Sequence, residues 1–549
     1  MNKFFKCVIA FTLLLTMLVS ATGCQLISSL FPEDDPAPVE PNPEDKPDEP
    51  VLTGVDKVIY DARKETDARI EEIRNTPNME IPEGATVYYV SEYGDDSNDG
   101  LTEDTAWLTL DKVNSANIPA GAYVCFQRGT TWRGQLVAKR GVTYTAYGEG
   151  DKPIITASPE NGADSSKWVE TEYENVWRYT TKFDLDVGCI IFNDGEEWGR
   201  KTVVCATAIS SSVPTELKDQ EFYNATTKEA WSGLSDLDDD LHFYHNCYDK
   251  LFDGDTNDKY VYLYSEENPG ERFDSIEFSI QQHVITVNYV NDVTIDNIAV
   301  KYGGAHGISA IDVENFNCTN LEVGYIGGSY SSPNTKTKNV RYGNGIQVWD
   351  YCDGWTVENC YIYQCYDTAV TPQGSLGSAT KLNNEHNITI TGNVMEYYNW
   401  GLEYWLGYTE EVKQTYKNFL FEDNYMWYAG QGICETRKDW GNMAHIRGGS
   451  SSNTNGRNYA ENFVIKNNVM IGSERYMTLI TWQGDMTENE KKSCAPQMYD
   501  NVFVGKENNR FIFEYYVYSS GYWGKQNTMD KAADLLNGYG ENNEVWVMK

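Results

Sequence analysis

The sequence predicts an all-β protein, a right-handed parallel β-helix with a small β-rich module inserted in it. A short unit recurs across residues 284–504, and each copy ends in an Asn that follows an alternating segment such as Val293-Thr294-Ile295. A repeat of roughly 20 to 25 residues with strand-like alternation cannot bury an apolar face alone, whereas stacked copies can. The repeated Asn residues are Asn297, Asn320, Asn359, Asn393, Asn424, Asn468 and Asn501.

Stacking places the same Asn of each coil at one corner. Parallel coils rise by about 4.8 Å, so we expect the seven side chains to form one ladder that joins each coil to the next. A β-sandwich with Asn-rich turns is the alternative architecture. Several units also carry a second short strand, which starts near Gly307, Gly345, Thr368, Gly401 and Gly432.

Residues 1–23 are typical of a secretory signal peptide. Lys3 and Lys6 precede an apolar run at 7–19, and small residues precede Cys24. This end resembles the lipobox of bacterial lipoproteins, which implies that Cys24 is lipidated and becomes the mature N-terminus. A plain signal peptide cleaved nearby is the alternative. We therefore expect an extracytoplasmic protein held at the bacterial cell surface by a lipid anchor.

The rest of the chain divides by composition and pattern. Residues 24–54 form the lipidated N-terminus and a tether rich in Pro, Asp and Glu, which cannot bury enough apolar surface to fold. Helical spacing at 55–84 predicts a helical lead-in. The remaining segments are the N-terminal part of the β-helix at 85–157, the inserted module at 158–283, the main coils with a groove at 284–520 and a C-terminal cap at 521–549.

Several motifs after residue 85 carry a family resemblance. Tyr88-Tyr89-Val90-Ser91, the Gly-Asp-rich loop at 94–100 and Trp132-Arg133-Gly134 resemble the opening of pectate-lyase-like β-helix proteins from carbohydrate-degrading bacteria. In the loop, Asp95, Asp96 and Asp99 could ligate Ca²⁺. A solvated Asx-rich turn is the alternative, and no cofactor is required by this interpretation.

Composition narrows the partners. The formal net charge of −38 argues against a nucleic-acid partner, because phosphate binding needs basic patches, and weakly disfavours a polyanionic substrate. The 12 Cys are not spaced as a metal site. Trp, Tyr and Phe make up 13% of the chain, which is enough to supply sugar-stacking surfaces for a carbohydrate partner.

Loop lengths predict a groove along the second strands. Extra residues leave the coils on both flanks of these strands, and such insertions usually mark the binding face. If Ile308, Ile346, Ala369, Leu402 and Ile433 face the core, alternation turns their next residues toward the groove. The groove-facing set is then Ser309, Gln347, Val370, Glu403 and Cys434.

Asp367 and Glu403 are the predicted catalytic pair. Glycoside hydrolysis needs two carboxyl groups, and these two lie on successive coils. Residues 361–374 and 395–404 resemble β-helix glycoside hydrolases of the xylosidase and fucosidase type, which place an acidic pair on neighbouring coils. An outward Glu403 between Trp400 and Trp405 is partly desolvated, which raises its pKa toward that of an acid catalyst.

The other candidates form the expected substrate-binding surface. The tryptophans among them offer aromatic faces to sugars, and the polar residues offer hydrogen bonds. They are His306, Asn344, Gln347, Trp349, Asp350, Gln373, Trp400, Trp405, Arg437, His445 and Arg447.

We therefore expect a cell-surface glycoside hydrolase that cleaves a plant or host polysaccharide. Two alternatives stay open. A polysaccharide lyase on the same fold would need a base such as Arg437, Lys438 or Arg447, and often Ca²⁺. A non-catalytic glycan-binding solenoid would need neither acid.

Overall fold

The computed structural model places residues Thr53–Lys549 in one compact unit. It describes residues 52–205, 222–224, 227, 229, 231–247, 258–330, 341–407, 409, 411–440, 443–449, 458–481, 487–513, 516–517, 522–523, 526–536 and 538–548. The predicted signal peptide, Cys24 and nearly all of the tether lie outside these residues. In the described part of the chain, none of the helices has the length and apolar character needed to cross a membrane.

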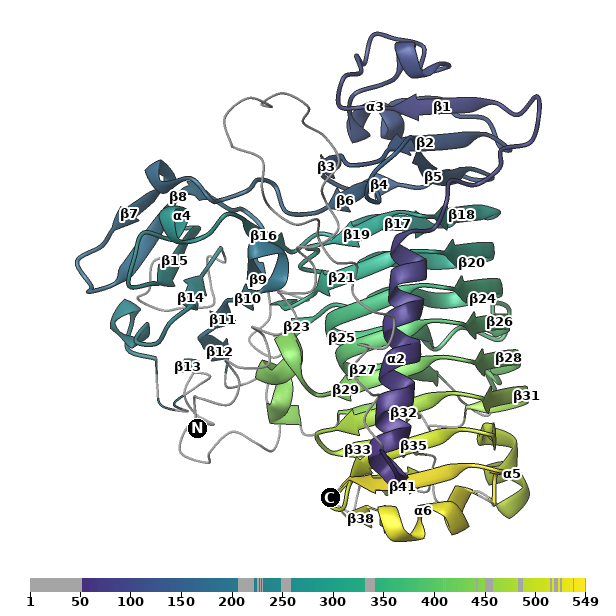
Figure 1. The fold of residues 1–549 in the computed structure, drawn as a ribbon. Helices are drawn as coiled ribbons and strands as arrows, with labels where there is room; N and C mark the ends of the chain where they lie inside the picture. The colour runs from purple at the N-terminus through teal and green to yellow at the C-terminus, as the bar shows by residue number, and fades with distance from the viewer. Residues whose placement is uncertain are drawn as a thin grey trace, which may run out of the picture. The chain divides into compact units, whose positions relative to one another are not determined.

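The chain winds into a parallel β-helix whose coils stack in a 27-stranded sheet (Figure 1). Each full coil supplies strands to three faces, which we name the site sheet, the second sheet and the third sheet. Pairing between successive coils is parallel throughout these faces, so the predicted fold class is confirmed.

The strands of each face follow in chain order. The site sheet holds β4 (Leu136–Val137), β17 (Ile285–Asn288), the first parts of β20 (Ile308–Thr319) and β24 (Ile346–Glu358), the last parts of β25 (Tyr361–Gly374) and β27 (Val394–Leu406), β30 (Ala444–Gly448), β33 (Tyr476–Ile480) and β36 (Arg510–Phe513). The second sheet holds β5 (Thr143–Tyr147), β18 (Val293–Asp296), the last parts of β20 and β24, β26 (Glu385–Thr391), β28 (Thr415–Glu422), β31 (Tyr459–Lys466), β34 (Gln497–Tyr499) and β40 (Gly540–Glu541). The third sheet holds β6 (Ile154–Thr156), β19 (Ala299–Lys301), β21 (Glu322–Ile326), the first parts of β25 and β27, β29 (Tyr425–Ala429), β32 (Val469–Ser473), β35 (Val502–Lys506) and β41 (Glu544–Met548).

Alternation along each strand fills the interior with stacked apolar side chains. On the second sheet, Phe316, Trp355, Ile388, Phe419 and Phe463 occupy one column and are all buried. The rings of the last two stack at 4.3 Å between centroids. Each coil thus buries an apolar face that it could not bury alone.

The Asn ladder is shorter and differently placed than predicted. Side-chain amides join Asn393 to Asn424, then Asn468, Asn501 and finally Asn543, each at 2.9 Å. A single ladder of all seven predicted residues is wrong, because Asn297, Asn320 and Asn359 sit one position earlier in the coil, where φ is 50–54°. That corner has two adjacent positions that favour Asn, one for its left-handed backbone and one for its amide.

Helix α2 (Gly54–Arg74) runs along the outer face of the third sheet (Figure 1). Its Ala62 packs with Trp427, Ile471 and Val504 from three successive coils. Arg63 forms an ion pair with Glu396 on β27. The helix therefore fastens the start of the described chain to the coils.

Between β6 and β17 the chain leaves the large sheet and builds its own small sheets. One contains β11 (Arg200–Lys201), β14 (His242–His245), β15 (Tyr260–Tyr264), β8 (Val176–Lys182) and β7 (Trp168–Glu170), and another contains β10 (Glu197–Trp198), β9 (Val187–Phe192) and β16 (Ile276–Ile280). An aromatic core including Tyr179 and Phe278 lies between these strands. At the C-terminal end of the coils, α6 (Met529–Leu536) buries Met529, Ala532 and Leu536.

Candidate active site

The register of the site sheet differs by one residue from the prediction. Val370, and not Ala369, pairs with Ile346 and Leu402. The cause is a register shift between Cys365 and Thr368, a bulge that alternation alone does not reveal. Thr371 therefore stands between Gln347 and Glu403, in the place that the sequence assigned to Val370.

The predicted strand at Gly432 is wrong. Gly432–Trp440 forms the 3₁₀ helix η7, and Gly432 has φ of 79°, which turns the chain out of the coil. Strand β30 takes the vacant place instead, so that Arg447 pairs directly with Glu403. As a result, Cys434 lies on η7 and not on the groove face of the sheet.

Glu403 is buried at the centre of a polar cluster, with 5% of its surface exposed. Arg447 from the next coil donates to its Oε1. Its Oε2 accepts a hydrogen bond from Gln373 Nε2 at 2.7 Å and another from Thr368 Oγ1 at 3.1 Å. Both carboxyl oxygens are therefore held in fixed positions.

Electrostatics make Glu403 a weaker acid than usual. Burial raises the pKa of Glu403, and the negative charge of Asp367 raises it further. The guanidiniums of Arg447 and Arg437 oppose this without reversing it. A raised pKa keeps a proton on the carboxyl at higher pH, as a general acid requires.

Asp367 lies in the bulge at the start of the site strand of β25 and is 9% exposed. Arg437 on η7 contacts its Oδ2 at 2.6 Å, so the aspartate points toward η7 outside the coil and not into the core. Its Oδ1 is buried and accepts no hydrogen bond within the described part of the chain. Unpaired buried acceptors are costly, and they often have a functional explanation.

Trp400 joins the two acid–arginine pairs. The guanidinium of Arg447 lies 3.9 Å from its ring centroid and that of Arg437 lies 5.0 Å away. Since only 3% of Trp400 is exposed, it supports the arginines and offers no open face to a sugar, which corrects its predicted role.

Two tryptophans lie at the C-terminal end of the site strands. Trp349 and Trp405 meet edge to face, with ring centroids 5.4 Å apart, and both are partly exposed. Gln373 lies between them in the register of the sheet. Nearby, Asp350 accepts hydrogen bonds from the backbone N and Oγ of Ser375, so it orders a loop at this edge.

A chain of hydrogen bonds orders the opposite edge. The backbone N of Asn344 donates to Nδ1 of His306, and the backbone N of His306 donates to Nδ1 of His283. Asn344 also donates from its side chain to Gln347 Oε1 at 2.7 Å. Because burial lowers the pKa of His283 to about 4 and that of His306 well below its usual value, both rings are neutral.

One further site assignment changes with the structure. His445 is fully buried inside the coils, where Nδ1 lies 2.6 Å from Tyr398 Oη and burial lowers its pKa to about 3. His445 therefore points into the coils and does not reach the outer face of the site sheet. The sequence also missed Thr368, Thr371 and His283, and the one-residue bulge is the reason for the first two.

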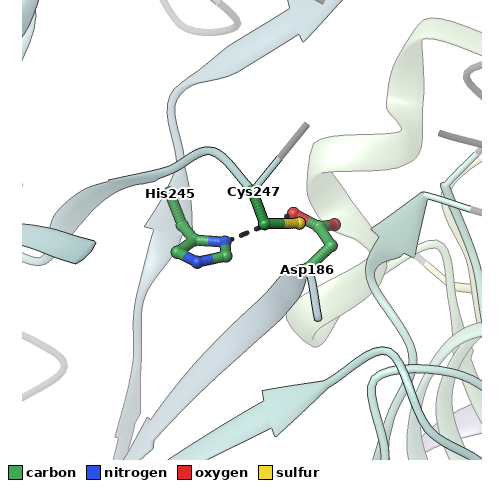
Figure 2. Close-up of side chains that lie close together, drawn as sticks. All are labelled: Asp186, His245 and Cys247. Atoms are coloured by element: carbon green, nitrogen blue, oxygen red, sulfur yellow. Dashed lines mark ion pairs between the residues drawn. The ribbon is translucent and has the colours of Figure 1, made fainter. Parts of the chain in front are cut away.

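The described residues contain one cluster with metal-ligand types, Asp186, His245 and Cys247 (Figure 2). Lys201 already donates to Asp186 Oδ1, and the backbone N of Val187 donates to His245 Nδ1 at 3.2 Å. Burial alone would raise the pKa of Asp186, but Lys201 and His245 hold it below its usual value. The carboxylate already has its cation and one imidazole nitrogen is engaged, so the cluster does not fit a metal ion.

The acidic loop proposed for Ca²⁺ is ordered by its own backbone. Asp95 accepts from the N of Ser97, Asp99 from the N of Leu101, and Asp96 from the N of Leu108 and Thr109. The bonds to Asp95 and Asp99 are those of Asx turns, whereas Asp96 joins the loop to the N-terminus of the helix that begins at Leu110.

Comparisons with known proteins find similarities that are short or distant. No family model matches the chain. A lacto-N-biosidase of Bifidobacterium longum subsp. longum is 32% identical over 111 residues, which is 18% of this chain and only 7% of that protein. Solved structures with a similar course include XylC in complex with xylose (12% identity, TM-score 0.39, 77% of this chain and 76% of that one) and a GH136 lacto-N-biosidase from Eubacterium ramulus (13%, 0.32, 90% and 70%). Likenesses this distant carry no argument about chemistry, which must come from the site itself.

Proposed function

We propose that the chain is a glycoside hydrolase that cleaves a polysaccharide or oligosaccharide on its site sheet. The observation that carries this proposal is the pair of nearly buried carboxyls on neighbouring coils, each held by an arginine, with the pKa of Glu403 raised by burial. Two carboxyl groups in different environments are what acid–base cleavage of a glycosidic bond needs. The similarity to a lacto-N-biosidase, although short, supports a carbohydrate substrate.

Each acid then has its own role. Glu403, whose pKa is raised by burial, donates its proton to the glycosidic oxygen as the bond to the leaving sugar breaks. Asp367, held in place by its contact with Arg437, attacks the sugar carbon or activates the water that does so. Arg447, Gln373 and Thr368 orient the acid, while Trp349 and Trp405 offer partly exposed aromatic surface to a sugar.

The residues that were candidate bases for a lyase do not support that alternative. Arg437 and Arg447 are each paired with a carboxylate, and an arginine stays protonated in proteins. The side chain of Lys438 lies outside the described residues. The glycan-binding alternative is favoured by one observation, since both acids are nearly buried and both are ion-paired.

Product chemistry separates the three functions. The full chain is incubated with a panel of plant and host glycans, and reducing ends and ultraviolet absorbance are measured together. The proposal expects new reducing ends with no unsaturated product. Unsaturated products would indicate a lyase, and retention of a glycan without cleavage would indicate a binding protein.

We also propose that the enzyme works at the bacterial cell surface through a lipid on Cys24. The apolar run at 7–19, the small residues before Cys24 and the acidic tether support this location. Cys24→Ser is expected to move the protein from the membrane fraction to the soluble fraction of expressing cells. Equal membrane retention of both forms would contradict the anchor.

A further inference from the structure

A cavity of about 530 Å³ lies outside the groove, on the outer face of the third sheet. This volume is within the range of small-molecule sites. Helix η7 contacts both the cavity and the candidate active site: the backbone N of Ile433 donates to Gln364 Oε1 at the cavity, and Arg437 on the same helix contacts Asp367.

Three tyrosines and a glutamine in an unusual backbone conformation line this cavity. Tyr302, Tyr325, Gln364 and Tyr397 have φ of 55°, 57°, 50° and 56°, and the strand register places them at the same corner of four successive coils. Left-handed backbone is disfavoured for bulky side chains, and Gly, Asn and Asp adopt it most readily.

The corner between the second and third sheets meets the same backbone requirement in the ordinary way. Every left-handed residue there is Asn, Asp or Gly: Asn297, Asn320, Asn359, Gly392, Asp423, Asn467, Asp500 and Asn542. Tyrosine therefore contributes something other than the turn at the cavity corner. Strained residues of this kind gather at ligand sites, where their side chains are needed.

The lining also indicates the chemistry of the ligand. Three basic and three acidic side chains balance one another, namely Arg74, Lys152, Lys301, Asp151, Asp194 and Glu322. Glu322 is fixed by Lys301 at 3.0 Å and by the hydroxyl of Tyr363 at 2.8 Å. A net-neutral lining with fixed polar groups, in which Tyr397 is a partly exposed ring, suits an uncharged ligand that carries both hydroxyls and C–H faces.

We propose that this cavity is a second saccharide-binding site, which takes a neutral sugar unit independently of the groove. This inference goes beyond the proposed function and does not require the groove to be catalytic. A site behind η7 would hold one part of a glycan while another part reaches the groove.

Calorimetric titration of the full chain tests the proposal, with lactose, cellobiose and xylobiose as probes and with Glu403→Gln present to prevent turnover. We expect saturable binding of at least one disaccharide. Tyr397→Asn should weaken that binding at least tenfold while leaving the melting temperature equal or higher, because Asn suits the left-handed backbone.

Tyr289→Asn is the matched control. Tyr289 also has left-handed backbone, with φ of 58°, but it is 66% exposed and does not line the cavity, so binding should be unchanged. Lys301→Met is a second test of the cavity in case Tyr397→Asn does not fold, and it too should weaken binding tenfold. Absence of binding to the parent protein, or equal binding by the cavity variants, would overturn the proposal.

Discussion

Strand β27 carries two glutamates in closely similar surroundings. Each is 5% exposed, each forms an ion pair with an arginine, and each arginine lies over a tryptophan ring. The two sets are Glu396 with Arg63 and Trp427, where the guanidinium is 5.0 Å from the ring centroid, and Glu403 with Arg447 and Trp400, where it is 3.9 Å away.

The two sets differ in the groups that lie beyond the arginine and the tryptophan. Arg63 comes from α2, 333 positions away in the sequence, and Tyr361 Oη also donates to Glu396 at 2.9 Å, so this set fastens the helix to the coils. Glu403 has a second acid, Asp367, with an arginine of its own. A buried glutamate on an arginine therefore does not mark a site by itself, and the second carboxyl is the feature that does.

The largest expected effect comes from removing the carboxyl of Glu403, compared with the same change at Glu396. Glu403→Gln should lower kcat by about 10²- to 10⁴-fold, the usual contribution of a general acid. Glu396→Gln, on the same strand and equally buried, should keep the parent kcat. Reducing-end assays of the two variants measure the comparison, and equal losses would remove the distinction between the two glutamates.

The second effect concerns the alkaline limb of the pH profile. Activity should fall as pH rises through the raised pKa of Glu403, because the proton donor is then lost. Asp367→Asn removes a negative charge that raises this pKa, so the residual activity should fall at a lower pH than in the parent protein. Profiles of kcat/KM for both proteins provide the measurement, with Glu396→Gln as a control that should not shift. If the activity of both proteins falls at the same pH, the charge of Asp367 does not act on Glu403.

The smallest effect is on stability. Glu396→Gln removes the charge that Arg63 pairs with, and it should lower the free energy of unfolding by about 1–2 kcal/mol. Urea denaturation followed by tryptophan fluorescence measures this change. A variant as stable as the parent would show that α2 is held by its apolar contacts with Trp427 and Val504 alone.

The sequence predicted the parallel coils because their alternation and corner Asn residues are local signals. It did not predict the register around Asp367, because the bulge between Cys365 and Thr368 depends on the neighbouring coil. Gly432-Ile433-Cys434 looks like a strand by composition, yet the left-handed Gly432 and the hydrogen bond to Gln364 turn it into η7.

The candidate acids were identifiable from their residue types, but their partners were not. The pairing of Arg447 with Glu403 requires knowing that 444–448, and not 432–434, forms the next strand. The pairing of Glu396 with Arg63 joins residues far apart in the sequence, which no local pattern reveals. The inward placement of His445 does not follow from alternation either, because Arg447, two residues later, faces outward beside Glu403.

The central claim is that Glu403 delivers a proton to the leaving sugar, and its dependence on the leaving group tests this most directly. The activities of the parent and Glu403→Gln are compared on a cleaved oligosaccharide and on the dinitrophenyl glycoside of the same sugar, whose leaving group departs without protonation. The account predicts a loss of about 10²- to 10⁴-fold on the oligosaccharide and a far smaller loss on the aryl glycoside. Equal losses on both substrates would contradict it.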